Sequence, residues 1–193
     1  GILNSAEGSN YSGWTGGNSN SYDRVQTVLD ARGYNTLILE NSDITSGSSL
    51  ETLGIDVLVI PDNGPTDSAA QAIGDWVRDY NGPIVTMDSS IVVLFYEGLI
   101  TGDYHVSNYY STYWTYSSPE QGKVSNVDHD VMTSYSLNEI ITGTSGNAQM
   151  FNSEIKTKLG TNSEYYTGLV QNPSTPNNDL VWALGLPDQG RMV

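Results

Sequence analysis

The side chains best suited to chemistry follow short apolar runs of the chain. Glu7, the pair Asp62-Asn63 and the pair Asp88-Ser89 each come shortly after a run with the composition of a buried strand. In an open parallel sheet, ligands bind beside the carboxyl ends of the strands. We therefore expect these five residues to lie at one ligand-binding edge of a sheet.

Asp88 and Ser89 are candidates for catalysis as well as for binding. Ser89 at a turn from a strand into a helix is a candidate nucleophile, because backbone amides at such turns form an oxyanion hole. The run from Met87 to Ile91 lacks the flanking glycines of a nucleophile elbow, and His129 is only a distant candidate base. Capping of the following helix by Asp88 or Ser89 is the favoured alternative.

Three of these residues are carboxylates that could hold a cation. If Glu7, Asp62 and Asp88 converge, their mutual repulsion favours a hard ion with oxygen ligands, and calcium is the cation that we expect. The alternative is that the three carboxylates stay apart in solvent. No other cofactor is expected, because the sequence holds no GxGxxG or GxxxxGK[ST] fingerprint.

Two further patterns have both a functional and a structural interpretation. His129 lies between Asp128 and Asp130, as in a fragment of a metal site, but a single histidine does not specify zinc and a structural turn is favoured. The aromatic stretch 104–116 is suited to stacking on carbohydrate or to a protein interface. Packing over a sheet edge is the alternative.

Periodic apolar residues predict alternating strands and helices in the first half of the chain. Helices are expected over 22–32 and 67–80, and strands over 36–39, 55–60 and 84–87. Such βαβ units form a parallel sheet with right-handed crossovers. The predicted fold is α/β, a three-layer sandwich with a mostly parallel central sheet.

The second half of the chain has a different texture, with short strand patterns between polar loops. Strands are expected over 123–127, 139–142, 148–151 and 180–184, and a loop with two prolines over 172–178. We expect a single domain over residues 1–193, in which 1–98 is the βαβ core and 99–193 is a strand-rich extension. The whole is expected to be a fragment of a larger protein.

Composition excludes several classes of partner. With 7 Lys plus Arg against 22 Asp plus Glu, the net charge is −15, so nucleic acid and anionic membranes are not expected to bind. No apolar run reaches the roughly 18 residues of a membrane span. The absence of cysteine excludes disulfides, thiolate metal sites and a cysteine nucleophile. Abundant Tyr, Ser and Asn favour an extracellular or cell-surface location.

Several motifs carry a resemblance to a known superfamily. They are the segments 1–8, 32–34, 55–61 and 82–89, with weaker likeness at 127–133 and 190–193. Together they resemble the class I glutamine amidotransferase-like superfamily, which has a flavodoxin-like fold. The resemblance implies that residues 191–193 begin a core strand. It also implies a catalytic cysteine at the position of Asp88 and a late His-x-Glu pair, and this sequence has neither.

The expected function follows from these departures. We expect a pseudoenzyme, a non-catalytic binding or assembly domain of a secreted or cell-surface protein, with a cation or small-ligand site at the carboxyl edge of the sheet. Expected partners are other domains of the parent protein, a second copy, or carbohydrate. The alternative is a hydrolase that uses Asp88, Ser89 and His129.

Overall fold

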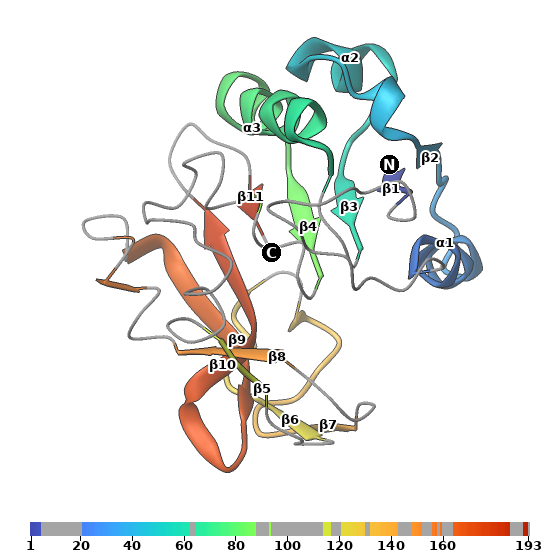
Figure 1. The fold of residues 1–193 in the computed structure, drawn as a ribbon. Helices are drawn as coiled ribbons and strands as arrows, with labels where there is room; N and C mark the ends of the chain where they lie inside the picture. Colours follow the sequence, from blue (N-terminus) through green and yellow to red (C-terminus); the bar gives the residue numbers. More distant parts are fainter. Residues whose placement is uncertain are drawn as a thin grey trace. The chain divides into compact units, whose positions relative to one another are not determined.

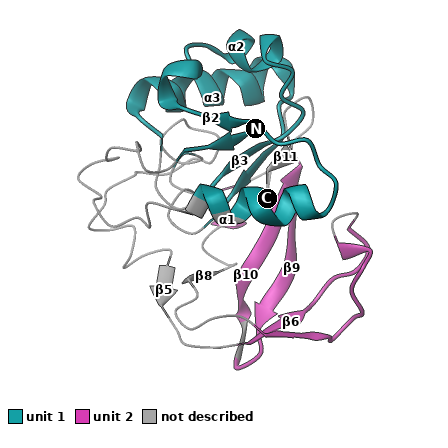
Figure 2. Ribbon diagram, turned by 90° about the vertical axis from the view of Figure 1, so that its right-hand side faces the viewer, with its two compact units in different colours: residues 1–106, 186–192 teal, residues 107–185, 193 magenta. Residues whose placement is uncertain are grey.

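The computed structural model describes residues 1–4, 21–61, 65–87, 93, 114–116, 121–129, 132–142, 148–151, 156–157, 159, 164–185 and 191–192. The chain divides into two compact units (Figure 2). The first unit contains residues 1–106 and 186–192, and the second contains 107–185 and 193. That both belong to a single domain over 1–193 stays a prediction.

The first unit is built on parallel strands (Figure 1). They are β1 (Ile2–Leu3), β2 (Ile38–Leu39), β3 (Leu58–Ile60), β4 (Ile84–Thr86) and β11 (Arg191–Met192). Their order is β2-β1-β3-β4-β11, and each neighbouring pair is parallel. The prediction of an α/β fold with parallel strands is confirmed, and Met192 pairs with Ile84 in the core strand expected near the end of the sequence.

The helices of this unit are α1 (Ser21–Ala31), the short 3-10 helix η2 (Asn41–Asp43), α2 (Gly47–Thr52) and α3 (Asp67–Tyr80). The periodic segments predicted as helices over 22–32 and 67–80 are therefore helical. The chain leaves α1 through Gly33, whose φ of +84° favours glycine. None of the described helices is long and apolar enough to cross a membrane.

Helices α2 and α3 pack closely against each other. A Cβ atom at Gly47 would lie 2.8 Å from the backbone nitrogen of Trp76, so only glycine allows this approach. Trp76 is buried, and its Nε1 donates to Glu51 Oε1 at 2.7 Å. Gly82 leaves room for the indole ring, because a Cβ there would lie 2.1 Å from it. Glycines on both sides thus position the largest core side chain.

The second unit consists of antiparallel strands. They are β5 (Trp114–Tyr116), β6 (Gln121–Val124), β7 (Ile140–Thr142), β8 (Ala148–Phe151), β9 (Tyr166–Asn172) and β10 (Thr175–Gly185). Strand β9 lies between β10 and β6, β7 pairs with the other side of β6, and β8 pairs with both β10 and β5. The prediction of a strand-rich second half is confirmed.

The predicted loop over 172–178 is wrong. Strand β9 extends to Asn172 and β10 begins at Thr175, so only two residues form the turn. The side chain of Asn172 accepts a hydrogen bond from the backbone N–H of Ser174 at 2.8 Å, which closes the turn. Pro176 is tolerated in a strand here because the pairing of β10 shifts register between Thr175 and Asp179.

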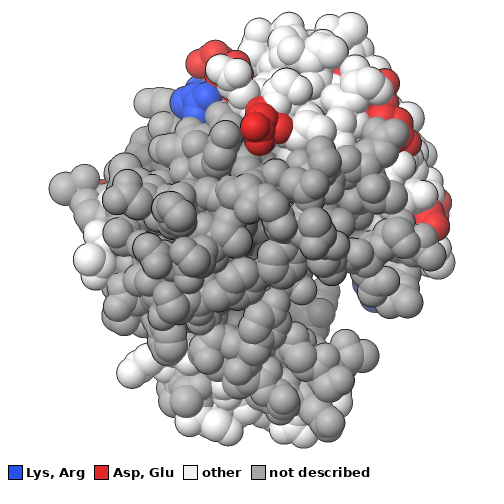
Figure 3. Space-filling view, viewed as in Figure 1, with Lys and Arg blue, Asp and Glu red and all other residues white. Residues whose placement is uncertain are grey.

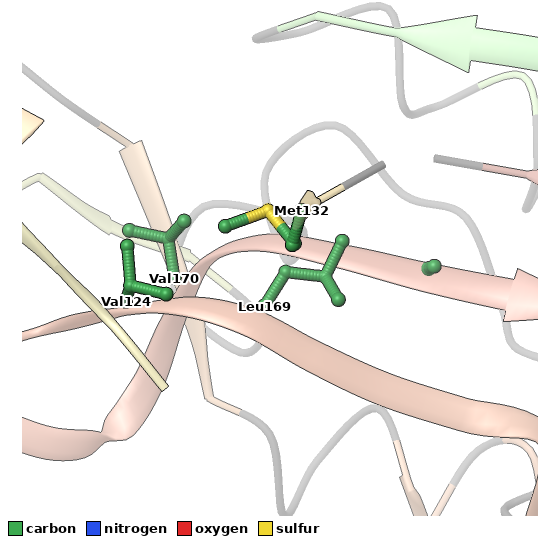
Figure 4. Close-up of a cluster of buried hydrophobic side chains, with 5 residues drawn as sticks. Val124, Met132, Leu169 and Val170 are labelled. Atoms are coloured by element: carbon green, nitrogen blue, oxygen red, sulfur yellow. The ribbon is translucent and has the colours of Figure 1, made fainter. Parts of the chain in front are cut away.

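A small apolar cluster forms the core of the second unit (Figure 4). It contains Val124, Met132, Leu169, Val170 and Ala183, and all five are buried. The members come from β6, β9, β10 and the short segment before β7. Burial of these side chains is the main stabilising term for strands too short to be stable in isolation.

Candidate functional site

The residues predicted to line the binding edge follow strands that the structure does form. Strands β1, β3 and β4 end at Leu3, Ile60 and Thr86. Glu7, Asp62, Asn63, Asp88 and Ser89 themselves lie outside the described residues. Their convergence therefore stays a prediction, and so does a cation site made by Glu7, Asp62 and Asp88.

The strand order creates a topological switch point in the first unit. From β1 the chain passes to β2, its neighbour on one side, whereas from β3 it passes to β4, its neighbour on the other side. Strands β1 and β3 are adjacent and parallel. The connections that follow them thus diverge, and open α/β sheets bind ligands where the strand order reverses in this way. Glu7 and the pair Asp62-Asn63 follow these two strands in the sequence.

Two polar side chains meet at the described part of this edge. The pairing of Leu3 with Leu39 continues in a hydrogen bond from Asn4 N to Leu39 O at 2.7 Å, so Asn4 and Glu40 follow adjacent strand ends. The Nδ2 atom of Asn4 donates to both carboxylate oxygens of Glu40, at 2.9 Å each. Both residues are half-buried. The Asn4 amide thus fixes the orientation of the Glu40 carboxylate beside the switch point.

A second contact fastens the loops at the same edge. Asn41 Oδ1 accepts from the backbone N–H of Thr66 at 2.9 Å, and Thr66 is the residue that precedes α3. This bond links the segment after β2 to the segment after β3. The Nδ2 atom of Asn41 is buried and has no hydrogen-bond partner among the described residues. Buried donors of this kind are normally satisfied by protein, water or ligand.

His129, the candidate base, belongs to the second unit. Its backbone carbonyl accepts from Met132 N at 2.8 Å, and the neighbouring Asp128 N donates to Asn126 Oδ1 at 2.8 Å. These bonds are those of a polar turn, which agrees with the structural interpretation of this segment. Asp130 lies outside the described residues. A role of His129 beside Ser89 stays a prediction.

A buried polar group in the second unit was not foreseen from the sequence. Asp179 is 1 % exposed, and it accepts a hydrogen bond from the hydroxyl of Tyr166. Burial, followed by the charge of Asp179 and this hydrogen bond, raises the pKa of Tyr166. A Cβ at Gly168 would lie 2.8 Å from the Asp179 carboxylate. Trp182 lies against the Tyr166 ring with its centroid 5.5 Å away. The group forms a packed interior polar pair.

Acidic groups do not gather into a metal cluster in the described part of the chain. No set of three or more His, Asp or Glu side chains there could hold an ion. On the face seen in Figure 3, acidic side chains are scattered over the described surface. Negative charge spread over a surface in this way favours solubility and attracts cations from solution.

Comparison with family models, with curated proteins and with solved structures finds no match to this chain. The resemblance to the amidotransferase-like superfamily therefore rests on the sequence motifs alone.

Sequence reasoning missed Asn4 and Glu40, although a signal was present. Each directly follows an apolar pair that forms a strand, which is the same signal that pointed to Asp62 and Asp88. Asp179 had no comparable signal, because its burial depends on pairing between β10 and β9.

Proposed function

We propose that this chain is a non-catalytic binding or assembly domain of a larger secreted or cell-surface protein, with its ligand site at the carboxyl edge of the parallel sheet. The observation that carries the proposal is the switch point between β1 and β3, beside which Asn4 holds the carboxylate of Glu40. A polar pair at such a point is suited to orienting a small ligand.

The non-catalytic part of the proposal is supported by the residues that the sequence lacks. The chain has no cysteine, so the nucleophile of the amidotransferase-like enzymes is absent, and Asp88 stands at the corresponding position. In this view the domain is a degenerate, amidotransferase-like three-layer sandwich and a pseudoenzyme. The fold alone does not imply an activity.

The location and the partners follow from composition. A net charge of −15 disfavours nucleic acid and anionic membranes. Polar, tyrosine-rich sequence supports an extracellular or cell-surface setting, where other domains of the parent protein, a second copy or carbohydrate would be bound. Calcium is the cation proposed for the carboxylates Glu7, Asp62 and Asp88.

Hydrolysis is the second candidate function, and the ending of β4 at Thr86 favours it. Asp88 and Ser89 follow the carboxyl end of that strand by two and three residues, in the position of an elbow. The hydrolase would need Ser89 as nucleophile and His129 as base, within hydrogen-bond reach of each other.

Turnover assays separate the two functions. Purified protein is incubated with nitrophenyl esters, anilides and glycosides, together with a Ser89→Ala variant and an Asp79→Asn control on α3. We expect no turnover above the buffer rate in any of the three. Turnover by the wild type and the control that disappears in Ser89→Ala would establish the hydrolase instead.

A further inference from the structure

Glu40 presents a carboxylate that is held in place but not neutralised. Both of its oxygens accept from Asn4 Nδ2 at 2.9 Å, and none of the described residues forms an ion pair with it. The residue lies directly after β2, next to the end of β1 at the switch point. Its negative charge is therefore available to a ligand that brings hydrogen-bond donors.

The hydrogen-bonding capacity of this carboxylate matches a pair of hydroxyl groups. An ionised carboxylate has two oxygens with about four acceptor positions. The Asn4 amide and the backbone N–H of Asp43, which the Glu40 side chain caps, use only part of them. Two neighbouring hydroxyls can each donate to one oxygen, and hydrogen bonds to an ionised acceptor are roughly twice as strong as neutral ones. In dinucleotide-binding α/β sheets, a carboxylate near the switch point accepts a ribose hydroxyl.

The orientation of Asn4 favours a donor ligand over a cation. A carboxylate only accepts hydrogen bonds, so the contact with both oxygens of Glu40 requires the amide nitrogen of Asn4 to face it. A calcium ion bound there needs oxygen ligands, and the Asn4 amide would have to turn over to supply one. The described residues also offer no cluster of three ligating side chains.

Charge favours a neutral ligand over a phosphate ester. A phosphate placed near Glu40 would be repelled by its carboxylate, and the whole chain carries a net charge of −15. The basic side chain of Arg78 is paired with Asp75 at 2.8 Å, in the last turns of α3. A nucleotide is thus a poorer fit than an uncharged sugar.

Asn41 carries a further buried hydrogen-bond donor at this edge. It follows Glu40 in the chain, and its buried Nδ2 has no partner among the described residues. A buried donor of this kind is normally satisfied by protein, water or ligand, and a bound water alone can fill that role.

From these contacts we propose that Asn4 and Glu40 form the polar anchor of a carbohydrate subsite, which holds two adjacent hydroxyls of a neutral sugar. The assignment rests on the binding function proposed above and names the ligand class of that edge. Glu40 is the acceptor, and Asn4 is the positioning residue that orients its carboxylate.

The test is an NMR titration of the whole chain with D-mannose, D-galactose, D-glucose and D-ribose. Deoxyribose, adenosine monophosphate and calcium chloride are the comparison probes. We expect at least one sugar to shift the side-chain amide signals of Asn4. Glu40→Ala should weaken that binding about tenfold or more, and Glu40→Gln, which keeps one carbonyl acceptor, should recover part of it. The control Asp79→Asn removes one charge from α3 and should leave the affinity unchanged.

Deoxyribose, which lacks one hydroxyl of the pair, should bind more weakly than ribose. The proposal is overturned if no sugar binds, if Glu40→Ala binds as tightly as the wild type, or if adenosine monophosphate binds while every free sugar fails. Calcium that shifts the Asn4 signals in place of a sugar would overturn it as well. None of these results concerns turnover, so the non-catalytic assignment is tested separately, by the turnover assays. If Glu40→Ala does not fold, the Glu40→Gln and deoxyribose comparisons decide.

Discussion

At the scale of single residues, Tyr166 and Asp179 form a buried, hydrogen-bonded pair in the second unit. Burial and the neighbouring carboxylate raise the pKa of Tyr166, so the folded state holds its proton more tightly than the unfolded chain. The resulting stabilisation is complete below the unfolded pKa of about 10. It declines as pH rises above that value, because the unfolded state then binds fewer protons.

Replacing Tyr166 with Phe should remove the loss of folding stability that the ionisation of Tyr166 causes at alkaline pH. It should also lower the free energy of unfolding at neutral pH by about 1–3 kcal/mol, because the buried Asp179 loses the hydroxyl donor. Urea unfolding at neutral pH and again near pH 11, just above the usual tyrosine pKa of about 10, measures both effects. The exposed Tyr135→Phe is the control. An alkaline decline that persists unchanged in Tyr166→Phe would contradict the assignment.

Gly168 should be intolerant of a side chain for a related reason. A Cβ there would lie 2.8 Å from the Asp179 carboxylate, whereas nothing lies within 4 Å of a Cβ at Gly185. Gly168→Ala should therefore destabilise the protein by about 1–3 kcal/mol, and Gly185→Ala, in the same hairpin, should change stability little. Chemical unfolding compares them. Equal stability of the two variants would show that the carboxylate moves aside without cost.

At the scale of elements, the contact between α2 and α3 depends on Gly47. Its Cβ would approach the Trp76 backbone nitrogen to 2.8 Å, and backbone cannot rotate away as a side chain can. Gly47→Ala should lower the free energy of unfolding by about 1–3 kcal/mol, despite the better helix propensity of alanine. The exposed Ser48→Ala, one residue further along α2, is the control. A stabilised Gly47→Ala variant would mean that propensity outweighs the clash.

Elements with a strong local pattern could be predicted from the sequence, and those that depend on pairing could not. Helix α3 has the predicted bounds because its apolar residues recur at helical spacing and Asn81 adopts the left-handed conformation that ends it. Strand β9 was not predicted, since Gly168 interrupts its middle. The structure explains that glycine by the carboxylate lying over it.

The candidate site likewise has a part that the local sequence pattern predicts and a part that depends on strand pairing. The rule that polar residues after buried strands line a binding edge applied to Asp62 and Asp88, and it applies equally to Glu40. What the sequence does not encode locally is the strand order, which brings β2 beside β1 and so brings Glu40 to Asn4. The decisive contact of the proposed site is therefore long-range.

At the scale of the whole molecule, the net charge of −15 should make stability depend on salt. Raising sodium chloride from about 0.01 M to about 0.15 M shortens the screening length from about 30 Å to about 8 Å. Self-repulsion then weakens, and the melting temperature should rise. A melting temperature that falls over this range would show that attractive charge pairs outweigh repulsion.

Calcium gives a sharper form of the same measurement. If Glu7, Asp62 and Asp88 bind the ion, calcium chloride should raise the melting temperature above that in sodium chloride of equal ionic strength, and a chelator should reverse the rise. Equal melting temperatures in the two salts would show that these carboxylates do not bind calcium.

The proposed ligand site lies at the carboxyl edge of the parallel strands, beside the switch point between β1 and β3. The measurement that tests this site is a map of backbone amide shifts across the whole chain in titrations with the sugar panel. We expect the largest shifts at Asn4, Glu40, Asn41 and the residues that follow β3. Largest shifts within 121–142 or 164–185, in the second unit, would contradict it.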